Sequence, residues 1–138
     1  MKIYDKLVEM STEKTCFCLL IDPDKQQPEK ALKTAQFAQG HGVDAILAGG
    51  SFMMNNRFEP TMKLLHQELD IPLLIFPGCF DFVSPHADAL LLLNMLSSRN
   101  PQFLVGEQLR AAPHIKKHRL EVISAGYLLV ESGAISSV

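Results

Sequence analysis

The sequence lacks a strong imbalance of charge. Its 138 residues contain 13 lysines and arginines against 15 aspartates and glutamates, so the formal net charge is only -2 at pH 7. Domains that bind nucleic acid through its phosphates usually carry a clear basic excess. We therefore predict no nucleic-acid partner.

The sequence also lacks a long hydrophobic run and has few cysteines. A membrane-spanning helix needs ~20 apolar residues in succession, and the run ALLLL at 89–93 is far shorter. The opening segment, MKIYDKLVEMSTEK, carries charges throughout, unlike a secretory signal peptide. The chain has three cysteines, Cys16, Cys18 and Cys79. Their odd number and their spacing do not fit a disulfide framework. We predict a cytoplasmic protein with no transmembrane segment.

What the sequence does contain is a regular alternation of apolar runs and helical patterns. The helical patterns cover 3–10, 28–42, 55–69 and 101–118, and the apolar runs cover 16–21, 43–50, 71–76, 87–95 and 120–130. Strands that are apolar on both faces and alternate with helices indicate a parallel sheet. Two α/β architectures remain open on this evidence, a doubly wound open sheet and a (β/α)8 barrel. We see no linker, repeat or low-complexity tract, and predict a single domain over 1–138.

Two segments depart from the regular alternation of strands and helices. The connection PGCFDFVSPH at 77–86 is too short for a full crossover helix with its loops, so we expect an extended piece or a loop there. In the pattern at 101–118, Pro101 suits a helix start, whereas Pro113 is expected to kink or end the helix.

Polar clusters follow each predicted strand. They are DPDK at 22–25, GGS at 49–51, PG at 77–78, SSRN at 97–100 and ESG at 131–133. In both candidate folds, ligands bind at the carboxyl edge of the sheet. These clusters are therefore expected to surround one site.

The first two clusters suggest a metal site, although each also has a structural interpretation. Asp24 is suited to a turn or a helix cap, and Ser51 is suited to capping the next helix. Neighbouring strands lie about 5 Å apart, however, so an oxygen of Asp22 and the hydroxyl of Ser51 can share one Mg²⁺. Such an ion keeps several waters and also takes phosphate oxygens. Gly49 and Gly50 would let a phosphate or metal approach the backbone.

Other candidate residues are less specific. His114 and His118 lie four residues apart in a basic segment and are expected at a solvated helix end. His86 precedes a strand and is expected near the mouth of the site, with a structural role favoured over a catalytic one. The apolar stretches at 52–54 and 80–82 belong either to the core or to an apolar wall for a hydrophobic substrate.

Five segments together resemble one family. They are LIDPDK (20–25), VDAILAGGS (43–51), PLLIFPG (72–78), SPHADALLLLNMLSSRNPQFLVGEQLRAAP (84–113) and GYLLVESG (126–133). In this order and spacing they resemble the geranylgeranylglyceryl phosphate synthases, in particular the archaeal and Bacteroidetes-like group. The likeness covers nearly the whole chain and corresponds to the N-terminal part of the family.

The resemblance implies a TIM-barrel-type (β/α)8 fold in which an extended segment replaces the third helix. It implies a Mg²⁺-dependent prenyltransferase of phospholipid biosynthesis, which joins sn-glycerol 1-phosphate to geranylgeranyl diphosphate as an ether and releases diphosphate. The metal ligands of the family match Asp22 and Ser51. The metal offsets the charge of the leaving diphosphate.

The chain also departs from the family pattern. A complete barrel takes about 250 residues, whereas this chain supplies strands one to five. The glycerol-phosphate groups of the family lie on strands six to eight, and this chain has no match for them. We therefore expect the 138-residue chain to be inactive by itself. The alternative is a non-catalytic half barrel that assembles with its missing half or with another copy, and the open strand edges favour a homo-oligomer.

Overall fold

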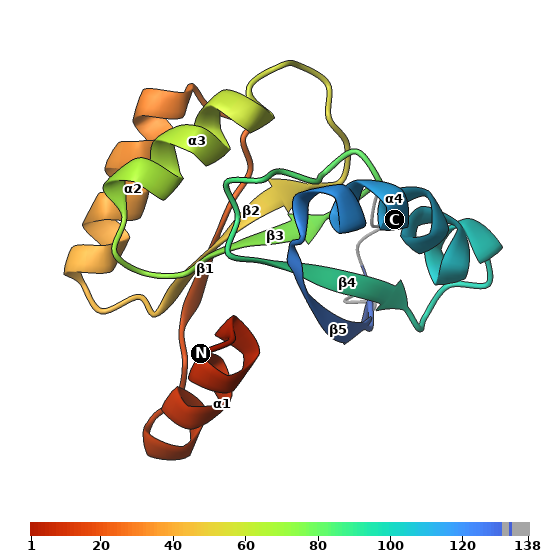
Figure 1. Cartoon of the computed structure of the whole chain (residues 1–138), viewed down its shortest axis with the longest axis horizontal. Coiled ribbons are helices and arrows are strands. Elements are labelled where there is room, and N and C mark those ends of the chain that lie inside the picture. The colour runs from red at the N-terminus through yellow and green to blue at the C-terminus, as the bar shows by residue number, and fades with distance from the viewer. Residues whose placement is uncertain (131–132, 134–138) are drawn as a thin grey trace.

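The computed structural model describes residues 1–130 and 133, and Figure 1 shows their arrangement. The strands are β1 (Cys18–Ile21), β2 (Ala45–Gly50), β3 (Leu73–Pro77), β4 (Ala89–Met95) and β5 (Glu121–Tyr127). The helices are α1 (Ile3–Glu13), α2 (Pro28–Gly40), α3 (Phe58–Glu68), the π-helical turn η1 (Gln102–Gly106) and α4 (Glu107–His118). Each strand and helix expected from the sequence is present, with small shifts at its ends.

The sheet is fully parallel, and its strands lie in chain order β1-β2-β3-β4-β5. In a doubly wound sheet the strand order reverses at a switch point. This sheet has no reversal across its described strands, and each strand pairs with the one that precedes it. The order is that of successive strands of a (β/α) barrel, which settles the choice left open by the sequence pattern.

The connection between β3 and β4 contains no helix, as expected. Its residues 78–88 form turns and bends, and they bury Phe82 and Ser84. Phe82 packs edge-to-face against Phe58 of α3, with ring centroids 5.0 Å apart. This aromatic pair holds the connection against α3.

Side chains of alternate strand positions form two separate apolar layers. On the outer face of the sheet, Ile46, Leu73 and Ile75 pack with residues of α2 and α3. On the inner face, Ala45 and Leu74 lie in a smaller cluster with partners from α1. Because successive strand residues point to opposite faces, the same register fixes both layers.

Helix α1 covers the inner face at the amino end of the strands. Its residues Ile3 and Leu7 pack in the inner cluster. The carboxylate of Glu121, at the start of β5, accepts hydrogen bonds from the amides of Ile3 (2.9 Å) and Tyr4 (3.0 Å). A carboxylate at a helix N-terminus satisfies free amides and complements the helix dipole. The contact ties the first helix to the last strand.

A second contact joins the end of α1 to the start of β2. The ammonium of Lys14 donates to the carboxylate of Asp44, which also accepts from the amide of Phe17 at 2.9 Å. These hydrogen bonds lower the pKa of Asp44, and the hydrogen bond to Asp44 raises the pKa of Lys14. Helix α1 is therefore held at both ends, which leaves the carboxyl edge as the accessible side of the inner face.

Pro113 was expected to kink or end its helix, and the second alternative is wrong, because α4 continues to His118. Ala111 is buried, and Ile115 packs against the outer core cluster. Packing on both sides of the proline thus sustains the helix despite the missing amide donor. The start of the segment also differs from expectation, since it forms the π-helical turn η1 rather than α-helix.

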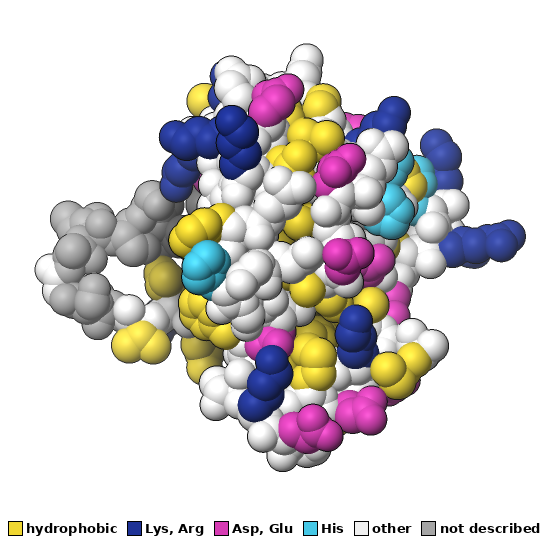
Figure 2. Space-filling model, turned by 90° about the vertical axis from the view of Figure 1, so that its left-hand side faces the viewer, with side chains coloured by type: hydrophobic (Ala, Val, Ile, Leu, Met, Phe, Trp, Pro, Cys, Tyr) yellow, Lys and Arg dark blue, Asp and Glu magenta, His cyan; other side chains and the backbone are white. Residues whose placement is uncertain are grey.

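The surface shown in Figure 2 is mixed in charge. Lysine and arginine side chains lie among aspartates and glutamates on this face, with apolar atoms between them. That is the pattern of an ordinary solvated surface rather than a basic patch. Among the described residues, no helix is both long enough and apolar enough to cross a membrane.

Candidate functional site

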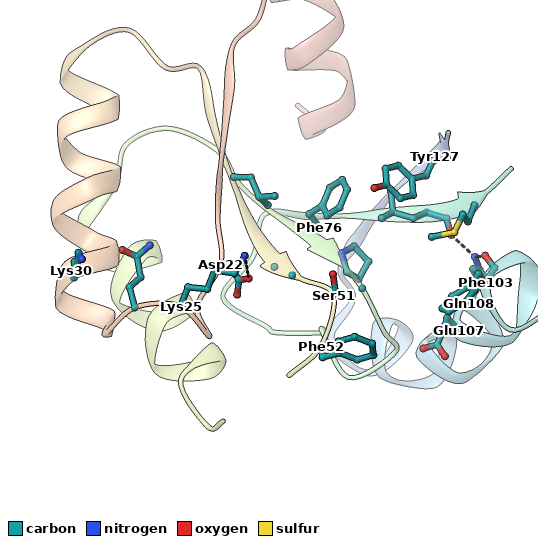
Figure 3. A pocket seen from close by; sticks show the side chains of 18 residues that line it. Asp22, Lys25, Lys30, Ser51, Phe52, Phe76, Phe103, Glu107, Gln108 and Tyr127 are labelled. Carbon is teal, nitrogen blue, oxygen red and sulfur yellow. Dashed lines mark hydrogen bonds and ion pairs between the residues drawn. The ribbon is translucent and has the colours of Figure 1, made fainter. Parts of the chain in front are cut away.

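A cavity of about 590 Å³ opens at the carboxyl edge of the sheet, and Figure 3 shows its lining. All five strands or the loops after them contribute, together with α2, η1 and α4. The lining residues are Leu20, Asp22, Lys25, Gln26, Lys30, Gly49, Gly50, Ser51, Phe52, Phe76, Pro77, Gly78, Leu93, Met95, Phe103, Glu107, Gln108 and Tyr127. The volume lies within the range of small-molecule sites, roughly 300–1,000 Å³.

The apolar part of the lining comes from alternate positions on the strands. Gly49 of β2 pairs with Phe76 of β3, and Met95 of β4 pairs with Tyr127 of β5. The rings of Phe76 and Tyr127 meet edge-to-face, with centroids 5.8 Å apart. The inner face therefore presents a continuous apolar wall from β3 to β5, beside the open edge of the sheet.

Asp22 lies directly after β1 and also lines the cavity. Its Oδ1 accepts a hydrogen bond from the Asp24 amide at 3.0 Å, and its Oδ2 lies 3.4 Å from the Lys25 ammonium. The carboxylate packs against Gly50, where an added Cβ would come within 2.8 Å of Oδ2. Glycine at position 50 thus leaves the room that the Asp22 carboxylate occupies.

Ser51 follows β2 on the same cavity wall and is held by close backbone packing. A Cβ on Gly78 would lie 2.0 Å from the Gly50 carbonyl oxygen and 2.5 Å from that of Ser51. A Cβ on Gly49 would lie 1.8 Å from the Phe76 carbonyl oxygen. The ends of β2 and β3 can approach this closely only because these positions lack side chains.

Asp24 joins the loop after β1 to the loop after β2. Its carboxylate accepts from the Met54 amide, and its carbonyl oxygen accepts from Asn55 Nδ2 at 3.4 Å and Arg57 Nη1 at 3.3 Å. Asp24 therefore helps to position the segment that follows Ser51. A tight turn alone would not require this second aspartate.

The helix-capping interpretations of these residues are wrong, whereas the turn interpretation is confirmed. Helix α2 has Gln27 as its N-cap and α3 has Arg57, so neither Asp24 nor Ser51 caps the following helix. The segment from Asp22 does form a turn, because the Lys25 amide donates to the Asp22 carbonyl oxygen at 3.2 Å.

The oxygens at this edge are of a kind that suits Mg²⁺. A carboxylate and a hydroxyl are hard oxygen donors, and Mg²⁺ in phosphate-binding enzymes takes only one or two protein ligands beside waters and phosphate oxygens. Within the described part of the chain, no three His, Cys, Asp or Glu side chains gather as a metal cluster. The residues present therefore fit an ion that arrives with a phosphate-bearing ligand, rather than one held by protein side chains alone.

A second polar group, which the sequence analysis did not predict, lines the opposite side of the cavity. The Glu107 carboxylate accepts from the Phe80 amide and from Gln102 Nε2. Gln108 Nε2 donates to the Leu93 carbonyl oxygen. These contacts fasten η1 and the start of α4 to β4 and to the 78–88 connection.

His86 does not lie at the mouth of the cavity, contrary to expectation. It is absent from the lining, its Nε2 lies 3.5 Å from a Glu59 carboxylate oxygen, and its ring lies 5.9 Å from that of His66. Both partners belong to α3, so His86 packs beside this helix. The reason is topological, because a residue that precedes a parallel strand lies at the amino edge, opposite the site.

The remaining candidates divide between cavity, core and solvent. Phe52 lines the cavity, Phe82 lies in the core, and His114 is exposed on α4. Burial raises the pKa of the Cys18 and Cys79 thiols, which disfavours the thiolate form that metal binding and nucleophilic attack require. The cluster expected after β5 includes Glu131 and Ser132, which lie outside the described residues.

Sequence reasoning missed several lining residues. Lys25, Lys30, Phe103 and Tyr127 were not named as candidates, yet all four line the cavity. Lys25 stands within the quoted DPDK cluster, and Tyr127 has the parity of the inward strand positions, so both carried a usable signal. Lys30 and Phe103 lie on helical segments, where the hydrophobic pattern does not distinguish residues that line the cavity from residues that face solvent.

Comparison with known proteins gives a consistent result. A model of the PcrB family matches residues 8–138. The chain is 38% identical over 133 residues to the geranylgeranylglyceryl phosphate synthase of Methanothermobacter marburgensis, a match that covers 96% of this chain and 54% of that protein. It is 39% identical over 138 residues to the synthase of Chitinophaga pinensis, with coverages of 99% and 55%. The chain spans about half the length of these curated relatives.

Solved structures agree with the sequence comparisons. The (S)-3-O-geranylgeranylglyceryl phosphate synthase of Thermoplasma acidophilum, solved with sn-glycerol 1-phosphate, superposes with a TM-score of 0.90 at 28% identity. That match covers 96% of this chain and 54% of the solved chain. The DHPS of Yersinia pestis superposes with a TM-score of 0.54 at 22% identity, which indicates a shared fold alone.

Proposed function

The chain belongs to the PcrB family, and from this premise we propose that its cavity binds the prenyl-diphosphate donor of an ether-forming prenyltransferase. The donor we propose is geranylgeranyl diphosphate, and the acceptor is sn-glycerol 1-phosphate. The observation that carries the proposal is that Asp22 and Ser51 line the same cavity as the apolar wall from β3 to β5. One end of the cavity thus suits a charged head, and the inner face suits a hydrocarbon tail.

In this proposal Asp22 and Ser51 hold Mg²⁺ together with diphosphate oxygens. When bound, the ion offsets negative charge on the departing diphosphate. Asp24 keeps the Ser51 segment against the turn after β1, through its contacts with Met54 and Asn55. Such positioning would favour catalysis, because preorganised charges stabilise the new charge that develops in the transition state.

The tail of the donor would lie against the inner face of the sheet. Phe76, Leu93 and Met95 line the cavity there, with Phe103 and Tyr127 beside them. Apolar surface removed from water contributes roughly 25 cal/mol per Å². The wall therefore supplies affinity for a long prenyl chain and keeps water away from its reactive end.

The reaction we propose is a substitution at the first carbon of the prenyl chain. The hydroxyl oxygen of glycerol 1-phosphate forms the new C–O bond and loses its proton, while the bond to diphosphate breaks and diphosphate leaves with the electron pair. Holding the acceptor close to that carbon can supply ~7–11 kcal/mol of the barrier. In TIM barrels, phosphate groups usually bind after strands seven and eight, beyond the five strands seen here.

We therefore expect residues 1–138 to bind the donor without forming the ether. The test incubates the purified chain, its length verified by mass, with geranylgeranyl diphosphate, Mg²⁺ and radiolabelled glycerol 1-phosphate. No labelled ether should be extracted, while a full-length relative run in parallel should yield it. Ether formed by the 138-residue chain would contradict this division of the site.

We also propose that the chain self-associates, or pairs with further strands, through its open edges, as a single partial-barrel domain in the cytoplasm. Within the described strands, β1 pairs only with β2, and β5 pairs only with β4. Apolar side chains next to these edges are exposed, with Phe17 at 61%, Leu20 at 49% and Val122 at 40%. Unpaired edges beside apolar surface favour strand addition.

Light scattering tests this assembly. At micromolar concentration the chain should have a mass above that of the 15.3 kDa monomer. Lysine substitutions at Leu20 and Val122 should shift it toward the monomer by placing charge beside both edges. A monodisperse monomer for the unchanged chain would contradict self-association.

A further inference from the structure

We propose that Lys25 and Lys30 bind the diphosphate group directly, as the cationic side of a site whose other side is the metal held by Asp22 and Ser51. This assignment rests on the proposed function, because it names further residues for the same ligand. The two lysines line the cavity that contains Asp22 and Ser51. Lys25 lies in the turn after β1 and Lys30 in the first turn of α2.

Both lysines lie on one side of the cavity. Figure 3 shows Lys25 and Lys30 beyond Asp22, on the side away from Phe76 and Tyr127. The apolar wall and the cationic group therefore lie on opposite sides of the proposed metal position. A prenyl diphosphate has the same polarity, with a hydrocarbon tail at one end and phosphate oxygens at the other.

Charge balance gives a physical reason for two lysines. The diphosphate carries several negative charges near neutral pH, and Mg²⁺ with one aspartate contributes a net charge of only one positive unit. Asp22 and Ser51 therefore leave much of the diphosphate charge without compensation. The ammonium groups of Lys25 and Lys30 each add one positive charge, and hydrogen bonds from a cation to phosphate oxygens are among the stronger ones.

The contact between Lys25 and Asp22 suggests that the Lys25 ammonium and Mg²⁺ compete for the same carboxylate. The Lys25 ammonium lies 3.4 Å from Asp22 Oδ2, and its side chain is 82% exposed. An exposed pair of this kind contributes little to stability and is easily rearranged. If Asp22 held Mg²⁺, like-charge repulsion would displace the Lys25 ammonium, which would then be free to contact the diphosphate.

This exchange predicts that Lys25→Ala affects binding of Mg²⁺ alone and binding of magnesium pyrophosphate differently. Lys25→Ala should leave the affinity for Mg²⁺ alone unchanged or slightly tighter, since it removes a cation that competes for Asp22. The same substitution should weaken binding of inorganic pyrophosphate in the presence of Mg²⁺ by about tenfold, and Lys30→Ala should do likewise. A purely structural role for Lys25 would not separate the two ligands in this way.

Titration calorimetry on the 138-residue chain provides the measurement, with inorganic pyrophosphate and Mg²⁺ at low ionic strength. Lys33→Ala is the matched control, because it removes the same charge from an exposed position of α2 outside the cavity lining. We expect Lys33→Ala to stay within about twofold of the unchanged chain. Circular dichroism confirms that the variants share one fold.

The outcomes separate this assignment from the proposed function. If the unchanged chain binds magnesium pyrophosphate and all three lysine variants bind it equally well, the lysine assignment is wrong and the proposed function stands. If the unchanged chain does not bind magnesium pyrophosphate at all, the proposed function fails and this assignment fails with it. Weaker binding for Lys25→Ala and Lys30→Ala, but not for Lys33→Ala, supports both.

Discussion

Replacing Asp22 by asparagine is expected to weaken the Mg²⁺-dependent binding of geranylgeranyl diphosphate by at least about 100-fold, the upper end of what disturbing the support of a metal ligand costs. Asparagine keeps the size of the side chain and an oxygen that can accept from the Asp24 amide, so the turn after β1 should survive. What it removes is the negative charge, and a neutral amide oxygen is a poor ligand for Mg²⁺. Titration calorimetry with and without Mg²⁺ measures the loss.

Asp70→Asn serves as the control for this substitution. Asp70 is exposed in the loop after α3 and accepts from Gln39 Nε2 at 3.3 Å, outside the cavity lining. It should leave donor binding unchanged. Equal affinity of the Asp22→Asn and unchanged chains at limiting Mg²⁺ would exclude Asp22 as a metal ligand.

Gly78→Ala should strongly destabilise the fold. The new Cβ would lie 2.0 Å from the Gly50 carbonyl oxygen and 2.6 Å from Ser51 Cα, and backbone atoms cannot rotate out of the way. Inserting a methyl group into well-packed structure costs about 1–3 kcal/mol, and occasionally more. We expect a loss at the upper end of that range in chemical denaturation, together with weaker donor binding because Ser51 is displaced.

Gly40→Ala is the matched control for Gly78→Ala. Gly40 is the last residue of α2, and an added Cβ meets no atom within 4 Å. Alanine is the better helix former by up to about 1 kcal/mol, so this variant should be as stable as the unchanged chain or slightly more so. Similar stabilities for the two variants would show that β2 and β3 do not approach as closely as described.

The alternation of helices and strands was predictable because the hydrophobic pattern records it directly. Runs such as the one at 71–76 are apolar on both faces, and in the structure Leu73 packs outward while Leu74 packs inward. The absence of a helix between β3 and β4 was predictable from the short length of that connection alone. The hydrophobic pattern alone fits both parallel architectures, whereas the family resemblance implied the barrel, and the strand pairing confirms it.

Local chemistry was less visible in the sequence where packing competes with propensity. Pro113 signalled a kink or an end of the helix, yet α4 continues through it, with Ala111 buried and Ile115 packed against the outer core cluster. The π-helical turn η1 has no compositional signature, and it follows Pro101 where an ordinary helix start was expected. Tertiary packing thus outweighs the local signal of Pro113.

The candidate site was predicted in part. In any parallel sheet the residues that follow neighbouring strands lie close together, so the proximity of the polar residues after β1 and β2 was predictable. Asp22 and Ser51 do line one cavity. The roles of Gly50 and Gly78 as close-approach positions required the structure, because a glycine after a strand is also an ordinary turn residue. The place of Lys30 in the lining also required the structure, because the sequence pattern did not show which face of its helix points toward the cavity.

Removal of the metal tests the central claim most directly. The claim is that Asp22 and Ser51 at the carboxyl edge hold a prenyl diphosphate through Mg²⁺. Geranylgeranyl diphosphate is titrated into the unchanged chain and into Asp22→Asn, each in Mg²⁺ and again after chelation with EDTA. We predict tight binding only for the unchanged chain in Mg²⁺. Binding by the unchanged chain that persists in EDTA, or that Asp22→Asn retains in Mg²⁺, would contradict it.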